Sequence, residues 1–180
     1  LVDITNIRHT PTTFDLSYVL GPRLNAASRI GEAMLASKIL SSNDLNEIES
    51  ISRKLHLLNE KRKLIEEKVL IEAKEQVYSQ KENKVIIVHS YDWHPGVLGI
   101  VASRILEEFQ KPVIVISKND IYGVGSARSL SNINLGSLII AAKEKGLILK
   151  GGGHMFAAGL KIENNKIDKF SNYLENMVSL

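Results

Sequence analysis

Residues 85–116 read VIIVHSYDWHPGVLGIVASRILEEFQKPVIVI, and this stretch decides the fold of the chain. Its two ends, residues 85–88 and 113–116, consist entirely of valine and isoleucine and have the length of buried strands. Residues 97–110 have the apolar pattern of a helix, which a Pro-Gly pair opens and a proline ends. The stretch therefore predicts a strand, a helix and a second strand, with the two strands paired in parallel.

The residues after this unit indicate further strands and helices. Strands are expected at 121–129 and 157–162, and helices are expected at 135–145 and 167–178. We therefore expect an α/β fold in which a small β-sheet is flanked by helices.

The amino-terminal half is dominated by one long amphipathic helix. From residue 45 to about residue 80, apolar residues recur at spacings of three, four and seven. Residues 42–44 (Ser-Asn-Asp) offer a polar cap before it, and residues 31–40 read as a short helix. At about 1.5 Å per residue the long helix runs roughly 50 Å, so it can connect two domains. Its charges indicate a solvated face, with coiled-coil pairing or DNA contact as alternatives.

Composition limits the classes of function. The chain has 180 residues, of which 44% are apolar, and it begins with Leu1 rather than with methionine. Because no run of about eighteen uncharged apolar residues occurs, we expect a soluble cytoplasmic protein with no membrane association, and residues 1–30 look like the end of a domain of a longer chain. The absence of cysteine excludes disulfides, thiolate metal ligands and a cysteine nucleophile. A net charge of +3 is compatible with nucleic-acid binding but does not argue for it.

The sharpest local motif is Gly151-Gly152-Gly153-His154. Glycine permits positive φ and lets a ligand approach the backbone without a Cβ in the way, so a phosphate can be held there. The alternative is a tight loop before the strand at Ala157, with His154 merely exposed. The motif is neither a P-loop nor a dinucleotide-binding fingerprint.

A second motif places two serines beside an arginine near the end of a predicted strand. Arg128 suits phosphate recognition because its guanidinium stays charged and presents two donors at once. Ser126 and Ser129 could add hydrogen bonds. The alternative is a hairpin turn with a surface arginine.

His94 precedes a Pro-Gly pair at the start of a predicted helix, where unpaired N–H groups attract anions. Its neighbour Trp93 is expected to be buried rather than to stack on a base. His94 itself either contacts a substrate or is an ordinary satisfied polar group.

Near the amino terminus, Arg23, Asn25 and Arg29 flank a patch of small residues at 26–28. If the segment is partly helical, the small patch allows another backbone to approach closely and leaves the arginines to reach a phosphate. The alternative is an ordinary start of an interdomain helix. No metal site can be built, because the five histidines are scattered and lack ligand spacing, and no serine-hydrolase pattern occurs.

Five segments occur in a recognisable order: GPRLNAASR, a long charged helix, WHPGVLGIVASR, GSARS and GGGHMFAAG. Their order and spacing resemble the RecJ family of single-strand-specific exonucleases, in the DHH phosphoesterase superfamily. The resemblance covers nearly the whole chain. It implies that residues 1–40 finish a DHH domain, that residues 41–83 form a connecting helix, and that residues 84–180 form the DHH-associated domain that binds substrate.

The same resemblance implies a function for the parent protein. It would hydrolyse single-stranded DNA from the 5′ end in repair and recombination, with Mn²⁺ or Mg²⁺ held by ligands outside this chain, and this piece would be inactive alone. The alternatives are a phosphodiesterase acting on cyclic dinucleotides or short oligonucleotides, and a non-catalytic binding or scaffold domain.

The resemblance also assigns roles to residues. The catalytic candidate is His154, in a loop that faces the metal centre, and the candidates for binding substrate or phosphate are Ser126, Arg128, Gly152, Gly153, Arg23, Asn25, Arg29 and His94. Ser28 and Ala127 stand where the family usually has glycine. A backbone position that needed positive φ would be strained by either change.

Overall fold

The computed structural model describes residues 1–178 and divides into two compact units, Leu1–Ile65 and Glu66–Leu180. Helix α3 (Leu45–Tyr78) contributes its first part to the first unit and its last part to the second. No helix among the described residues is both long enough and apolar enough to cross a membrane.

The first unit is helical. A short 3-10 turn (Asp3–Thr5) is followed by a π-helical segment (Asp15–Leu20) that continues into α1 (Gly21–Ile30), and α2 (Met34–Ser41) precedes α3. The helix expected at residues 31–40 is thus confirmed three residues later than its predicted start. Apolar side chains of α1, α2 and α3 form the core of this unit: Ala27, Leu35, Ile51 and Leu55, with Leu24, Ile39 and Leu58 packed against them.

A capping box starts the first long helical segment. Thr12 Oγ1 accepts a hydrogen bond from the Asp15 backbone N–H at 3.3 Å, and Asp15 Oδ2 accepts one from the Thr12 N–H at 2.9 Å. His9 Nε2 lies 2.9 Å from the same carboxylate oxygen. The bonds from Thr12, followed by the contact with His9, lower the pKa of Asp15 from 3.8 to about 2.

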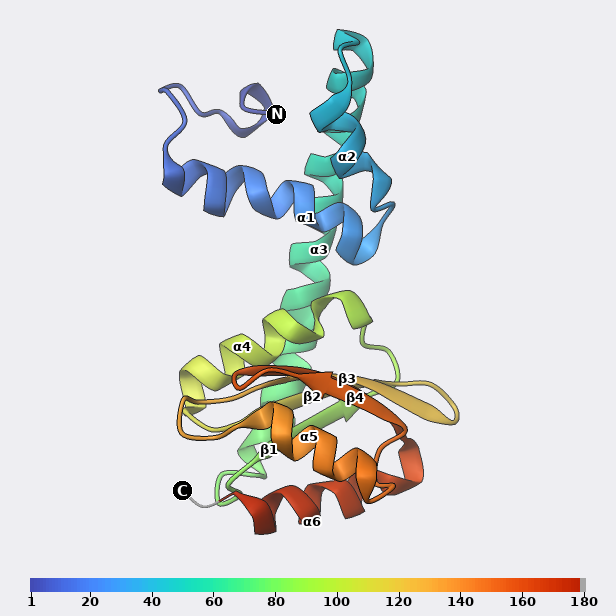
Figure 1. Ribbon diagram of the computed structural model, residues 1–180. Helices are drawn as coiled ribbons and strands as arrows, with labels where there is room; N and C mark the ends of the chain where they lie inside the picture. The colour runs from blue at the N-terminus through green and yellow to red at the C-terminus, as the bar shows by residue number, and fades with distance from the viewer. Residues whose placement is uncertain (179–180) are drawn as a thin grey trace. The chain divides into compact units, whose positions relative to one another are not determined.

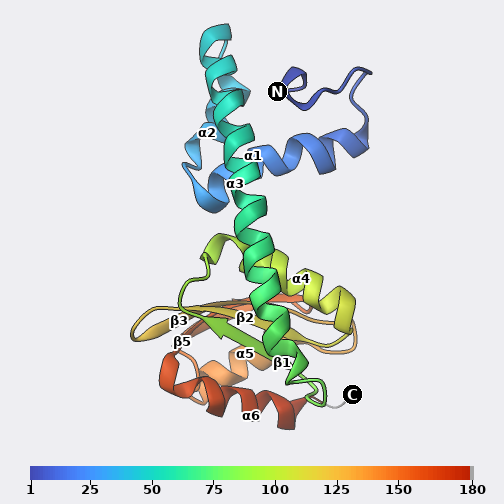
Figure 2. The same cartoon turned by 180° about the vertical axis from the view of Figure 1, so that it is seen from behind.

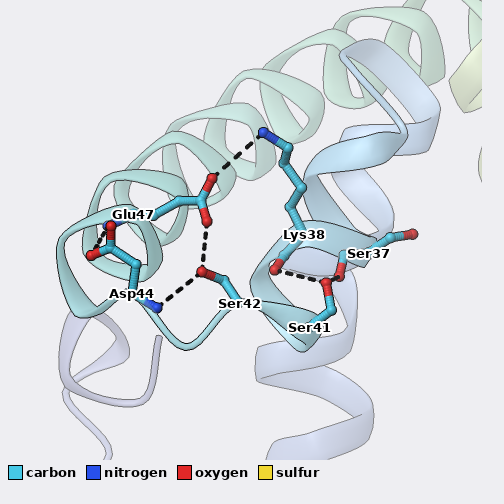
Figure 3. Close-up of polar contacts among 6 residues, drawn as sticks. All are labelled: Ser37, Lys38, Ser41, Ser42, Asp44 and Glu47. Carbon is cyan, nitrogen blue, oxygen red and sulfur yellow. Dashed lines mark hydrogen bonds and ion pairs between the residues drawn. The ribbon is translucent and has the colours of Figure 1, made fainter.

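The polar cap predicted before the long helix is confirmed (Figure 3). Asp44 Oδ1 accepts hydrogen bonds from the N–H groups of Asn46 and Glu47, which would otherwise lack partners at the helix start. Ser42 Oγ donates to the Glu47 carboxylate at 2.6 Å, and Lys38 Nζ lies 3.5 Å from its other oxygen. These contacts fix the turn between α2 and α3.

The second unit is built on a five-stranded sheet with the strand order β1-β2-β3-β5-β4. β1 and β2 are parallel, joined through α4 as predicted, and the remaining pairs are antiparallel. The elements are β1 (Ile86–Ser90), α4 (Leu98–Phe109), β2 (Val113–Lys118), β3 (Tyr122–Arg128), α5 (Leu135–Glu144), β4 (Lys150–Gly153), β5 (Ala157–Glu163) and α6 (Ile167–Met177). Short 3-10 turns at Pro95–Val97 and Asn164–Lys166 precede α4 and α6.

Helices cover the two faces of the sheet unequally (Figure 1). α5 and α6 lie on one face, where they bury side chains of every strand except the glycine strand β4, including Ile114, Ala127 and Leu160. α4 lies on the other face, against β2 and β3. Over β5 and β4 that second face is exposed at Gly159 and Gly152. The α/β fold with a small helix-flanked sheet is thus confirmed, and part of the sheet is open.

The end of α3 and the turn after it lie beside β1 (Figure 2). Two side chains from this segment cap the free edge of the strand. The Gln76 side chain donates to the His89 carbonyl and accepts from its N–H, each at 3.0 Å. Gln80 makes the same pair of bonds to Ile87, at 2.8 and 3.0 Å. Since an unpaired strand edge invites further pairing, the two amides close this edge of the sheet.

The triple glycine is part of a strand, so the alternative of a tight loop at this motif is wrong. Residues 150–153 form β4, which pairs with β5 at the sheet edge. Among the described residues only Gly146 is a glycine with positive φ, so the motif does not use glycine's left-handed conformation. Periodicity could not reveal this strand because glycine has no side chain to alternate.

Candidate nucleic-acid interface

The candidate site is the open face, defined as the α4 side of β3, β5 and β4. Ser126 on β3 lies opposite Gly159 on β5, and Gly159 lies opposite Gly152 on β4. Residues directly opposite in an antiparallel pair point to the same side, so these three form one row across the sheet. Arg128 points to the same side, because side chains alternate along a strand.

Arg128 and Ser126 lie together at the first turn of α4. Arg128 Nη1 donates to the Ala127 carbonyl at 2.8 Å and to Ser126 Oγ at 3.3 Å. A Cβ added at Gly99 of α4 would lie 2.9 Å from Arg128 Nη2 and 3.1 Å from Ser126 Oγ. The missing side chain of Gly99 therefore makes room for the guanidinium beside a helix amino terminus, where the dipole favours anions.

The alternative of a hairpin turn with a surface arginine is wrong for this segment. Ser126 and Arg128 are both within β3 and partly exposed. Ser129 is only 4% exposed, so it cannot meet a ligand at the surface. Arg128 and Ser126 are thus partly exposed on the open face, whereas Ser129 is buried.

The three glycines of the motif have different surroundings. A Cβ at Gly151 would meet Ile139 and Ile148 at 2.6 and 2.7 Å, and a Cβ at Gly153 would overlap the Ala157 carbonyl. A Cβ at Gly152 would meet nothing within 4 Å. Packing therefore explains the first and third glycines, whereas the middle one borders open space on the open face.

His154 is exposed and follows β4 at the turn into β5. Its backbone is held from two sides: its N–H donates to the Ala157 carbonyl at 2.7 Å, and its carbonyl accepts from the Gly136 N–H at 3.0 Å. Leu135 N–H likewise donates to the Met155 carbonyl. The start of α5 thus fixes this turn. The N–H groups of Leu135 and Gly136 are already bonded to carbonyls of the turn and do not face an anion.

His94 caps a helical turn with its own side chain. Its Nδ1 accepts a hydrogen bond from the Gly96 N–H at 3.0 Å, so the neutral ring carries its proton on Nε2. One N–H group at this helix start is therefore already bonded by His94 itself. Trp93 is 2% exposed and donates to Glu72 at 2.7 Å, which confirms that it is buried.

Arg23, Asn25 and Arg29 lie on α1 in the first unit. Arg23 bonds His56 Nδ1 through Nε at 3.2 Å and the Val19 carbonyl through Nη1 at 2.6 Å, so its guanidinium ties α1 to α3. Asn25 is exposed, and Arg29 is partly exposed at the end of the helix. Ala27 packs in the core, which agrees with close approach at the small patch.

The two departures from the family pattern cause no backbone strain. Among the described residues that are not glycine, only Asn6 and Gln110 have positive φ, so neither Ser28 nor Ala127 needs a left-handed conformation. Ala127 is fully buried in β3 opposite Ile114 and Ala158. The concern about loop geometry at these positions is therefore resolved.

The histidines do not form a metal centre. Within residues 1–178, no group of three or more His, Asp, Glu or Cys side chains is placed to hold a metal ion. His89 lies on the face of the sheet that α5 and α6 cover. Burial, and then the charge of Lys118, lower the pKa of His89 below the usual 6.5. The residues present therefore do not fit a metal site.

Three residues of the open face were not among the candidates predicted from the sequence: Gly159, Lys161 and Lys150. Lys161 lies opposite both Val124 and Lys150, in the row next to Ser126 and the two glycines. A signal was present, since residues 157–162 alternate small or polar with apolar residues, which places Gly159 and Lys161 on one side.

A family model described as the DHHA1 domain matches residues 82–180, more than half of the chain. This chain belongs to the DHHA1 domain family. The match contains the whole sheet, with the open face, His154 and His94, whereas Arg23, Asn25 and Arg29 lie before it.

The curated proteins that this chain matches are much longer than the chain itself. It is 35% identical over 169 residues to the single-stranded-DNA-specific exonuclease RecJ of Thermus thermophilus, covering 94% of this chain and 24% of the relative. The curated RecJ relatives that it matches are covered over only 21–31% of their length.

The fold of the DHHA1 domain chain is also found in solved structures. The crystal structure of Thermus thermophilus RecJ in complex with Mn²⁺ matches with a TM-score of 0.87 at 34% identity, over 98% of this chain and 26% of that one. The Mg²⁺ complex matches with a TM-score of 0.86 at 33% identity, over 98% and 27%.

Proposed function

We propose that this chain is the substrate-holding part of a 5′-to-3′ single-stranded-DNA exonuclease that acts in repair and recombination in the cytoplasm. The observation that carries the proposal is the placement of Arg128 and Ser126 at the first turn of α4, beside an exposed sheet face. The RecJ relatives, which match over most of this chain, support the choice of single-stranded DNA as substrate. We propose three parts for the chain. Residues 1–40 form the end of a DHH domain, residues 41–83 form a connecting helix, and residues 84–180 form the DHH-associated domain.

The chemistry of the site suits a phosphate. Arg128 Nη1 is already oriented by Ser126 Oγ and the Ala127 carbonyl, so the guanidinium lies fixed at the edge of the open face. A phosphate there would accept charge-assisted bonds from Arg128 and a bond from the Ser126 hydroxyl. Gly152 would let the strand approach the backbone beside it, and the exposed backbone of Gly153 would lie next to that strand. His94 would contribute through its Nε2–H.

His154 is proposed as the catalytic residue. Its side chain is exposed while its backbone is held at 2.7 and 3.0 Å by Ala157 and Gly136. A fixed backbone with an exposed ring positions an imidazole to donate a hydrogen bond or a proton to a reacting phosphate oxygen. Asn25 and Arg29 are proposed to contact the strand from the first unit, whereas the bonds of Arg23 favour a positioning role.

The proposed enzyme requires a divalent metal ion, Mn²⁺ or Mg²⁺, to activate water and to neutralise charge on the phosphate. The relatives' structures with these ions support this choice. Its ligands would lie outside this chain, since the described residues do not form a metal site. The chain alone should therefore bind DNA without cleaving it.

The proposal is tested by fluorescence anisotropy with a 5′-phosphorylated single-stranded oligonucleotide at low and moderate salt. The Arg128→Ala variant should lose about tenfold in affinity or more, because a charged bond to phosphate contributes roughly 1.5–3 kcal/mol. Arg53→Ala is the matched control, because Arg53 is exposed in the first unit and pairs only locally with Glu49. Its affinity should equal that of the unchanged chain.

Equal binding by the Arg128→Ala variant and the unchanged chain would contradict the phosphate role of this residue. Oligonucleotide length separates the proposed function from a phosphodiesterase acting on short substrates. A nuclease part should bind long strands better, with affinity that falls steeply as salt rises, whereas a small-molecule site should show neither effect.

A further inference from the structure

We propose that Lys161 and Lys150 form a second phosphate-contact point on the open face, which holds the DNA strand beyond the nucleotide bound at Arg128. This inference rests on the proposed function and extends it to residues outside the motifs found in the sequence. It is carried by the charges on β5 and β4 and by their register with Arg128.

The register places the two contact points on one face at a defined separation. Arg128 lies opposite Ala157 on β5, and Lys161 is four residues further along the same strand. At about 3.3 Å per residue, the two positions are roughly 13 Å apart along the sheet. Four is an even number, so Lys161 points to the same side as Ala157 and Arg128. A single nucleotide at Arg128 therefore does not reach Lys161, whereas the following nucleotides do.

Two residues of like charge are paired at this point. Lys161 and Lys150 are directly opposite in the β4–β5 pair. Such a pair destabilises a sheet when nothing compensates it, and a phosphate between the two ammonium groups would remove the repulsion. The nearby carboxylate of Glu163 lies 3.3 Å from Lys166 Nζ, so it already has a cationic partner.

Tyr122 holds Lys161 in place. The Lys161 Nζ lies 4.5 Å from the centre of the Tyr122 ring, within the range of a cation–π contact. The contact keeps the ammonium group over the open face instead of leaving it to sample solvent. A positioned cation costs less entropy on binding than a mobile one.

On β5 and β4, the surface between the two contact points has no side chain to obstruct a strand. Gly159 and Gly152 lie there in one row with Ser126. An added Cβ would meet nothing within 4 Å at Gly152 and nothing closer than 3.9 Å at Gly159. The strand can therefore pass from Arg128 to Lys161 over bare backbone.

The test compares a 5′-phosphorylated oligonucleotide of two nucleotides with one of roughly a dozen, a length within the range that single-strand-binding domains cover. Lys161→Gln should weaken binding of the long oligonucleotide about threefold to tenfold and should lower the salt dependence by about 0.7 in log–log slope, the value expected for one lost phosphate contact. Binding of the short oligonucleotide should not change. Lys161→Arg should retain the affinity, and thermal unfolding of both variants should match the unchanged chain.

The matched control is Lys169→Gln on α6, an exposed lysine on the opposite side of the sheet. If Lys161→Gln binds the long oligonucleotide as well as the unchanged chain while Arg128→Ala loses it, the second contact point is wrong and the proposed function stands. If Lys161→Gln weakens both lengths equally, Lys161 belongs to the first contact point and the inference is also wrong. If the unchanged chain binds neither oligonucleotide, both proposals fail.

Discussion

Glycine serves opposite purposes at neighbouring residues of β4. The backbone at Gly153 leaves no room for a Cβ because the Ala157 carbonyl occupies its place, whereas Gly152 borders open space. Since glycine inside a strand lowers stability, a glycine that packing does not require indicates close approach of a ligand. Gly152→Ala should therefore leave the fold intact or raise its stability slightly while it lowers affinity for single-stranded DNA.

The comparison variant is Gly153→Ala, which should lower the free energy of unfolding by about 1–3 kcal/mol, the usual cost of overpacking. Thermal unfolding followed by circular dichroism measures the first effect, and fluorescence anisotropy measures the second. Undiminished DNA affinity in a fully folded Gly152→Ala variant would show that no ligand lies against this residue.

Side-chain chemistry could be predicted from the sequence more easily than side-chain partners. That Ser126 lies beside Arg128 could be predicted because both residues occur within one short motif. The bond from Arg23 to His56 joins residues 33 positions apart, and the capping of Gly96 by His94 depends on the local turn. Neither contact follows from residue type. The sequence therefore did not indicate that the side chains of Arg23 and His94 already have hydrogen-bond partners within the protein.

At the scale of elements, the capping box before α1 predicts a pH dependence. The pKa of Asp15 is lowered to about 2 by hydrogen bonds from Thr12 and by His9. A carboxylate whose pKa is lower when folded stabilises the fold at pH values above its unfolded pKa of 3.8, and this contribution is lost as the pH falls from there towards 2. The first unit should therefore lose stability below about pH 4.

Chemical denaturation at a series of pH values measures this effect in the unchanged chain and in Asp15→Asn. The variant should be less stable at pH 7 and should show a flatter decline of stability between pH 4 and pH 2. Thr12→Ala removes the other half of the box and should cost about 1 kcal/mol. A decline of the same steepness in Asp15→Asn would mean that other carboxylates govern the acid sensitivity.

Elements with a strong apolar pattern could be predicted, and those without one could not. β1 and β2 were evident because runs of valine and isoleucine fill buried strands, and α3 was evident because its apolar residues repeat over many turns. β4 consists of one lysine and three glycines, so no pattern marks it. Its place is set by the backbone bonds to β5 and by packing under Ile139, which are tertiary contacts.

At the scale of the molecule, each of the two units has an apolar cluster of its own. The open face, with Arg128 and Lys161, lies in the second unit, as does the turn residue His154, and Asn25 and Arg29 lie in the first. No periodic pattern marks the boundary, because α3 continues through it. The proposed contacts to DNA are therefore divided between the two units.

A chain that begins at Glu66 tests this division. It retains all five strands, α4 to α6, the ion pair of Glu66 with Arg104 and the bonds from Gln76 and Gln80 to β1. It should therefore fold with the circular dichroism of a mixed sheet-and-helix protein and unfold cooperatively. It should also bind a 5′-phosphorylated oligonucleotide, lose that binding on Arg128→Ala, and fall short of the 180-residue chain by no more than the one or two contacts proposed for Asn25 and Arg29. If the chain that begins at Glu66 folds but does not bind the oligonucleotide, the main DNA-binding contacts lie in the first unit instead.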